Sequence, residues 1–83
     1  MNDETTFDDK EILKTKLLQI GQNISQIRKN KRISMYLIEN KSGVTRSNVY
    51  ALEKAKWPVN IVTLLKVLDV LDCKLIIKDN EQD

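Results

Sequence analysis

The segment Thr45–Lys54 carries the side chains best suited to recognise another molecule. Arg46 offers paired N–H donors that can bind both acceptors of a guanine, and Asn48 can make the equivalent pair of bonds to an adenine. Nearby hydroxyl groups suit phosphates, base edges or a thymine methyl group, and lysines suit phosphates. The candidates of these kinds are Thr45, Arg46, Ser47, Asn48, Tyr50, Lys54, Lys56 and Lys41. The chemistry they predict is non-covalent binding of DNA.

Each of these residues also has a purely structural interpretation. Thr45 can cap a helix, and Ser47 can be an ordinary polar residue of a first helical turn. Tyr50 and the lysines can simply face solvent.

Catalysis is poorly supported by the residue types present. The chain has no histidine, which removes the usual general base and a common metal ligand. Cys73 is the only cysteine, and it alternates with Leu75 and Ile77 on one apolar face, which favours a buried thiol over a nucleophile. Two glycines cannot build a phosphate-binding loop, and the acids at 39, 53, 69 and 72 show no paired spacing. We therefore expect no enzyme, no cofactor and no metal site.

Charge is distributed unevenly along the chain, although the net charge is only +2. Residues 28–56 hold eight bases and two acids, a net charge of +6, while residues 1–11 carry −4 and residues 79–83 carry −3. A basic centre between acidic ends favours a polyanionic partner such as double-stranded DNA. A solvated lysine-rich surface is the alternative interpretation.

Length and composition predict a single domain over residues 1–83. A hydrophobic content of 41% supports a globular core, yet a chain of 83 residues is small enough to gain stability from a second subunit. No apolar run approaches the roughly 20 residues of a membrane helix, and the acidic start is unlike a secretion signal. With one cysteine and no possible internal disulfide, we expect a cytoplasmic protein.

The elements that position the candidate residues can be predicted from spacing. After a tail at residues 1–7, Asp8 and Glu11 form a capping box for a first helix, with Phe7 packing onto Ile12. This helix ends near residues 29–31, and Gly21 within it either allows close packing or marks a break. Its apolar stripe is Leu13, Leu17, Ile20, Ile24 and Ile27.

Two short helices follow, hinged at Ser42-Gly43. Ser34 caps the first, Gly43 ends it in the left-handed conformation, and Thr45 caps the second. Pro58 stops the chain from continuing as helix, and Asn60 caps a fourth, leucine-rich helix. A pair of short helices, of which the second is exposed and polar, is typical of proteins that insert a helix into the DNA major groove.

Residues 73–78 change to a short, roughly alternating pattern that predicts a strand. A strand needs a partner for its backbone, and the same strand of a second copy would supply one in a homodimer. An extension of the fourth helix or a frayed end is the alternative. The residues predicted to dimerise are Cys73, Leu75, Ile76 and Ile77, and residues 79–83 form an acidic tail.

Over about residues 20–72 the chain resembles the Cro/repressor-type helix-turn-helix family, also called XRE-type. The residues in register with its motif are Ile24, Arg28, Ser34, Ile38, Gly43, Val44, Val49, Leu52, Glu53, Thr63, Leu64, Leu65 and Leu71. The resemblance implies an all-α, lambda-repressor-like bundle of four or five helices, here with a C-terminal strand pairing across a dimer. It also implies that Arg46 to Lys54 form the recognition helix and that Arg28 and Glu53 form a structural salt bridge.

The chain departs from the family pattern at three positions. Met35 stands where the family usually has a glutamine that clamps the DNA backbone, so Tyr36 becomes the candidate for that contact. Glu39 replaces an alanine and must reach water or a cation, and pairing with Arg46 would remove one proposed base reader. Ala55 stands where glycine is common. We expect Trp57 to pack over the end of the third helix.

The predicted C-terminal strand further resembles small regulators of the HipB antitoxin type. The sequence therefore predicts a homodimeric, sequence-specific repressor acting on a palindromic operator. Two alternatives remain at this point, an antitoxin that also binds a toxin protein and an interaction module that does not bind DNA. Met35 and Glu39 favour the second of these.

Overall fold

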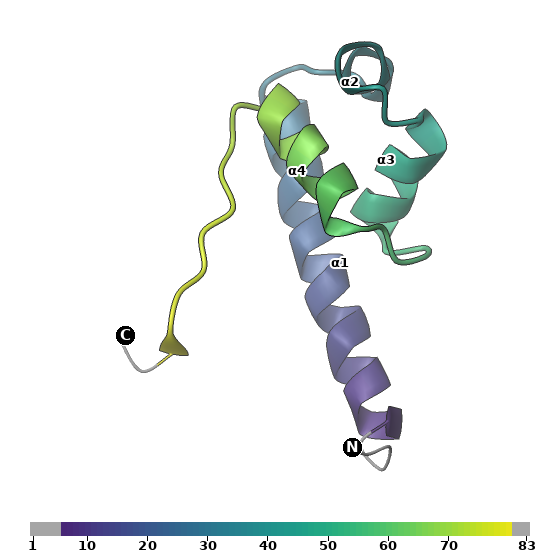
Figure 1. Ribbon diagram of the computed structural model, residues 1–83, viewed down its shortest axis with the longest axis vertical. Coiled ribbons are helices and arrows are strands. Elements are labelled where there is room, and N and C mark those ends of the chain that lie inside the picture. The colour runs from purple at the N-terminus through teal and green to yellow at the C-terminus, as the bar shows by residue number, and fades with distance from the viewer. Residues whose placement is uncertain (1–5, 81–83) are drawn as a thin grey trace.

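In the computed structural model, residues 6–80 are described and contain four α-helices (Figure 1). They are α1 (Thr6–Asn30), α2 (Met35–Ser42), α3 (Arg46–Lys54) and α4 (Ile61–Val70). Helix α1 is long, and the three short helices gather around its C-terminal half (Figure 1). This confirms the all-α, lambda-repressor-like prediction with four helices in the described part of the chain.

Helix α1 begins at Thr6, so the predicted boundary after residue 7 was wrong. Asp8 lies inside the helix, where it cannot serve as the N-cap of the predicted capping box. Residues 1–5 of the predicted tail at 1–7, and residues 81–83 of the predicted acidic tail at 79–83, lie outside the described residues. The helical end is where predicted, with Arg28 and Lys29 in the last turn beside the negative pole of the helix.

Only part of the predicted apolar stripe of α1 is covered. Ile24 is buried and Ile27 is half-buried, whereas Leu13, Leu17 and Ile20 are 56%, 41% and 40% exposed. The reason is geometric, because 25 residues of helix extend about 37 Å, well beyond the short helices that pack on them. The N-terminal half of α1 therefore projects past the bundle (Figure 1).

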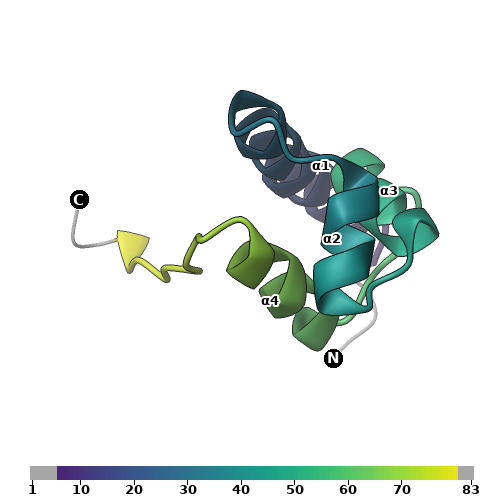
Figure 2. The ribbon, with the colours of Figure 1, turned by 90° about the horizontal axis from the view of Figure 1, so that it is seen from above.

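Helices α2 and α3 start and stop at the predicted residues. The Ser34 hydroxyl accepts a hydrogen bond from the Leu37 backbone N–H at 3.0 Å, and the Thr45 hydroxyl accepts one from Asn48 at 3.2 Å. Gly43 has a φ of 81°, the left-handed conformation that glycine adopts without strain. The Asn60 side chain caps α4 through the Thr63 backbone N–H. These local signals fix the turn that sets α3 beside α2 (Figure 2).

The core lies where all four helices meet. Apolar side chains from α2, α3, α4 and the C-terminal half of α1 are buried together, and they hold the two short helices against α1 and α4. Lys31 adds a polar tie, since its Nζ donates to the backbone oxygen of Leu71 at 2.6 Å. The buried residues that form this cluster are Ile24, Ile38, Val44, Val49, Leu52, Val67, Leu68 and Leu71.

Gly21 allows α1 and α3 to approach closely, which answers the question that the sequence left open. A Cβ atom at this position would lie 2.4 Å from the backbone oxygen of Glu53 and 2.5 Å from that of Leu52. Real Cβ atoms do not approach carbonyl oxygens so closely, so only glycine fits. Helix α1 runs through Gly21 without a break.

Residues 73–79 leave the bundle as an extended segment (Figures 1 and 2). The alternative of a longer fourth helix was wrong, because α4 ends at Val70 and Asp72 takes a φ of 57°. Within residues 6–80 the segment forms no strand, so pairing with a second copy remains a prediction. Cys73 is half-buried and packs against the core, whereas Leu75, Ile76 and Ile77 are 45%, 74% and 89% exposed.

Candidate nucleic-acid interface

A buried ion pair holds α3 in place. The Glu53 carboxylate accepts hydrogen bonds from Arg28 Nε at 2.6 Å and from Arg28 Nη2 at 3.1 Å. Arg28 Nη1 also donates to the backbone oxygen of Ile33 at 3.0 Å. The side chains are 11% and 1% exposed, so this two-point contact is shielded from water. It joins the end of α1 to the last turn of α3, which confirms the predicted salt bridge.

Arg46, the first residue of α3, contacts two residues of α2. Its Nε lies 3.0 Å from Oε1 of Glu39, and its guanidinium carbon lies 5.7 Å from the centre of the Tyr36 ring. The Arg46 side chain is 63% exposed and that of Glu39 is 36% exposed. Glu39 therefore has the cation that the sequence required for it, at the solvent-facing edge of the helix pair.

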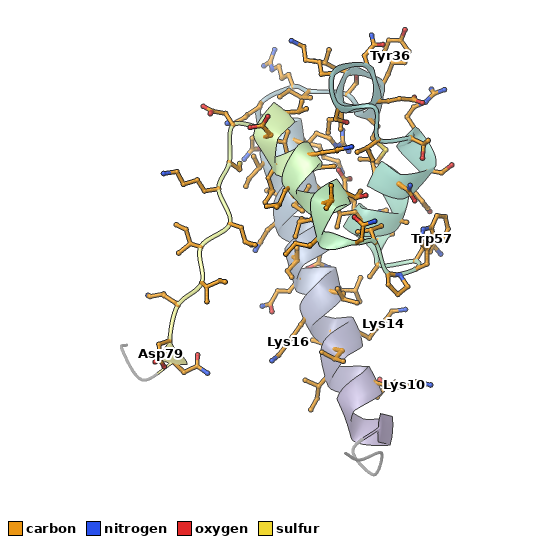
Figure 3. The ribbon with its side chains drawn as sticks, viewed as in Figure 1. Lys10, Lys14, Lys16, Tyr36, Trp57 and Asp79 are labelled. Atoms are coloured by element: carbon orange, nitrogen blue, oxygen red, sulfur yellow. The ribbon has the colours of Figure 1, made fainter. Side chains whose placement is uncertain are left out.

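Trp57 belongs to the same side of the molecule as α3. Its indole Nε1 donates to the Asn48 side-chain oxygen at 3.3 Å, although the ring is still 49% exposed. This contact reaches the first turn of α3 and not its end, so the packing of Trp57 over the end of that helix stays a prediction. Figure 3 shows the Trp57 side chain beside α3. The hydrogen bond fixes the Asn48 amide with its oxygen toward the indole.

These side chains border one open hollow on the outer face of the helix pair. Its lining residues come from the start of α2, from α3 and from the loop that follows: Met35, Arg46, Ser47, Tyr50 and Trp57. The surface combines a guanidinium, a hydroxyl, a phenol and an indole ring, and the N–H of that indole already donates to Asn48. Such a mixture suits a partner with hydrogen-bonding edges, flat rings and negative charge.

The remaining predicted DNA-binding residues do not line this hollow. Thr45 is exposed, and its hydroxyl is already used to cap α3. Lys41 is exposed in the last turn of α2. Lys54 borders a separate hollow against α1, and Lys56 borders another that Lys10 and Lys14 share. Figure 3 shows Tyr36 projecting outward from α2, so its predicted phosphate contact is sterically open.

The positive charge of the central segment is on the surface. Arg28 and Glu53 neutralise each other inside the protein, and the other seven bases of residues 28–56 are exposed against one half-exposed acid, Glu39. The surface contribution of this segment is therefore still +6. This charge can supply the salt-sensitive part of binding to a polyanion.

The sequence did not identify Met35 and Trp57 as part of the interface. The missing glutamine at Met35 and the expected packing of Trp57 gave neither residue a role in binding, yet both line the hollow beside Arg46. A signal was available for Trp57, since it directly follows the basic end of α3 and carries a donor that needs a partner. Nothing in the spacing indicated that Asn48 would supply that partner.

Two comparisons place these features among known proteins. Residues 23–76 match the model of the Cro/C1-type helix-turn-helix DNA-binding domain. The structure is also similar to a crystal structure of the restriction-modification controller protein C.AhdI from Aeromonas hydrophila, with a TM-score of 0.67 and 30% sequence identity. That similarity covers 72% of this chain and 91% of C.AhdI. No curated protein matches the chain significantly.

The family match includes α2 and α3 and begins within α1, so the first part of α1 lies outside it. Across residues 6–80, each helix is too short or too polar to cross a membrane.

Proposed function

Because the chain belongs to the Cro/C1-type helix-turn-helix DNA-binding family and is a DNA-binding transcription regulator, we propose that it acts as a homodimeric repressor on a roughly palindromic operator. Helix α3 of each protomer would enter the major groove of one half-site. The two half-sites would lie about 34 Å apart, one turn of B-DNA. We also propose that the protein works in the cytoplasm and has no catalytic activity of its own.

The observation that carries the base-reading part of this proposal is the exposed polar surface at the start of α3. Arg46, Ser47 and Tyr50 border the open hollow and are exposed, while Val49, Leu52 and Glu53 on the opposite side of the same helix are buried. One face of this helix is anchored in the core, and the other face is polar. The polar side chains can therefore contact base edges with little further ordering of the helix. Arg46 supplies the best specific donor pair, for guanine.

The similarity to C.AhdI supports a more specific role. That protein is a restriction-modification controller. We propose that this chain likewise controls the expression of genes of a restriction-modification system. The toxin-binding alternative rests on the C-terminal segment alone, and no contact within the described residues adds to it.

We expect replacement of Arg46 by alanine to remove the preference for one guanine in each half-site. A bidentate arginine–guanine contact contributes about 1–3 kcal/mol of discrimination, so the preference should fall by about 5- to 150-fold. Selection of preferred sites from random duplexes with both proteins measures this. Lys16→Ala is the matched control, because it removes the same charge from an exposed position on α1 (Figure 3). Equal weakening on the selected operator and on random DNA would contradict base reading by Arg46.

The dimer part of the proposal is supported by apolar surface that one chain leaves uncovered. Val62 and Leu65 of α4 and Leu75 of the C-terminal segment border one hollow, and they are 56%, 46% and 45% exposed. Ile76 and Ile77 extend this surface along the segment. A second copy could cover it, with the two segments paired antiparallel as the residues predict.

Replacing Leu75 and Ile77 together by serine should shift the protein toward monomer. Both side chains are exposed in the single chain, so the double variant should still fold, but the apolar area available to a partner falls. Sedimentation should show a dissociation constant at least about tenfold higher, and the affinity for a complete operator should fall more than that for a half-site. Lys74→Ser in the same segment is the control. A wild-type monomer at micromolar concentration, or an unchanged double variant, would contradict the proposed interface.

A further inference from the structure

Arg46 is held from two directions by the helix that precedes it. Glu39 contacts the side of the guanidinium through Nε at 3.0 Å, and the Tyr36 ring lies 5.7 Å from the guanidinium carbon. These two residues are three positions apart in α2, so they lie on one face of that helix. Glu39 and Tyr36 therefore both contact Arg46 from the same face of α2.

The atom that Glu39 engages matters for what Arg46 can still do. A guanidinium has three nitrogens, and recognition of guanine O6 and N7 needs a pair of N–H donors on one edge. A carboxylate placed at Nε is compatible with presenting the terminal amino groups outward. The Arg46 side chain remains 63% exposed, so those groups are accessible to a ligand that approaches α3.

An arginine without such contacts would lose more rotamer freedom when DNA immobilises it. It would also bind any nearby phosphate as readily as a base edge, because both are good acceptors. A fixed carboxylate beside the guanidinium reduces both effects. It orders the side chain beforehand, and its negative charge makes close approach of a phosphate to this position less favourable.

We propose that Glu39 and Tyr36 are positioning residues that direct Arg46 to a guanine in each operator half-site and away from the phosphate backbone. The inference rests on the proposed base-reading role of Arg46. It reverses the expectation from the sequence that capture by Glu39 removes this reader. The ion pair raises specificity at some cost in total affinity.

Glu39→Gln is the central test, because it keeps the size of the side chain and removes its charge. Binding is measured at one salt concentration to the selected operator, to the same operator with the Arg46-dependent guanines replaced, and to a random duplex. We expect a two- to fivefold loss of discrimination between the first two, the range expected for an exposed ion pair, and equal or tighter binding to the random duplex. Glu11→Gln, the same change on exposed α1, should leave the discrimination unaltered.

Tyr36 provides a second and independent measurement. Tyr36→Phe keeps the ring under the guanidinium and should retain the discrimination, even if a phosphate contact of the hydroxyl is lost. Tyr36→Leu removes the ring and should lower the discrimination by about two- to fivefold. A residue that only supported the fold would change the thermal midpoint of unfolding and all three DNA affinities together.

The outcomes separate this inference from the function on which it rests. If Arg46→Ala leaves every base preference unchanged, base reading by Arg46 fails and the positioning role fails with it. If Arg46→Ala removes a preference but Glu39→Gln keeps or increases it, only the positioning role is overturned, and Glu39 then competes with DNA for Arg46. In the Arg46→Ala background, Glu39→Gln should cause no further loss at that base pair, and a further loss would also overturn the inference.

Discussion

Replacing Glu53 by alanine should destabilise the protein by about 3–5 kcal/mol, because it leaves the Arg28 guanidinium inside the protein without its carboxylate. A domain of this size has a total stability of about 4–12 kcal/mol, so a large share of it would be lost. Urea denaturation followed by circular dichroism measures the change. DNA binding should fall together with the folded population, because Glu53 sits in the last turn of α3 and ties it to α1.

Two further variants show whether burial is the cause. Glu39→Gln removes an ion pair of the same chemistry at an exposed position, and it should change the free energy of unfolding by less than about 1 kcal/mol. The double variant Arg28→Met with Glu53→Leu removes both buried charges and should regain most of the stability that Glu53→Ala loses. A loss below about 1 kcal/mol for Glu53→Ala would show that water screens the pair, contrary to the 1% exposure of Glu53.

The sequence was most informative where one residue determines one local conformation. Ser34, Gly43 and Thr45 were predicted as caps from residue type and spacing alone, and each acts as predicted. A short polar side chain before a helix can satisfy free backbone N–H groups whatever the rest of the chain does. Glycine at a helix end likewise needs no tertiary partner to adopt a positive φ. The boundaries of α2 and α3 could therefore be predicted almost to the residue.

Contacts between helices were harder to predict from the sequence than their ends. Spacing predicted one apolar stripe on α1, but it could not show that Leu13 and Leu17 would extend past the short helices. Which half of an apolar stripe is buried depends on the lengths and crossing angles of the other helices. These are properties of the tertiary structure. The position of Trp57 over Asn48 is of the same kind, since it depends on the loop at residues 55–60.

The candidate interface contains features that the sequence predicts and features that depend on tertiary structure. The exposed residues of α3 followed from the periodicity of a short amphipathic helix, because Val49 and Leu52 had to face the core. The pairing of Arg46 with Glu39 was foreseen as one of two options, and only the turn at Gly43 determines that Arg46 lies within reach. The C-terminal segment at residues 73–79 is the opposite case, since its predicted strand requires a second chain that one sequence does not place.

The substitution Gly21→Ala should also destabilise the protein strongly, although alanine has the higher helix propensity. Alanine is the better helix former by about 1 kcal/mol, so an isolated α1 would gain stability from the change. In the folded protein the new methyl group would meet the backbone oxygens of Leu52 and Glu53 at 2.5 and 2.4 Å. Backbone atoms cannot rotate away as a side chain can, so α1 and α3 must separate.

The separation should cost about 1–3 kcal/mol net, which thermal or urea unfolding measures directly. Gln22→Ala is the matched control, because this neighbour is exposed on the same helix and should change stability by no more than about 0.5 kcal/mol. The clash falls on the turn of α3 that Arg28 also holds, so displacing it strains the buried ion pair and moves the exposed face of the helix. Operator affinity should therefore fall even where the variant is fully folded. A Gly21→Ala protein as stable as the wild type would mean that the two helices pack further apart than this geometry requires.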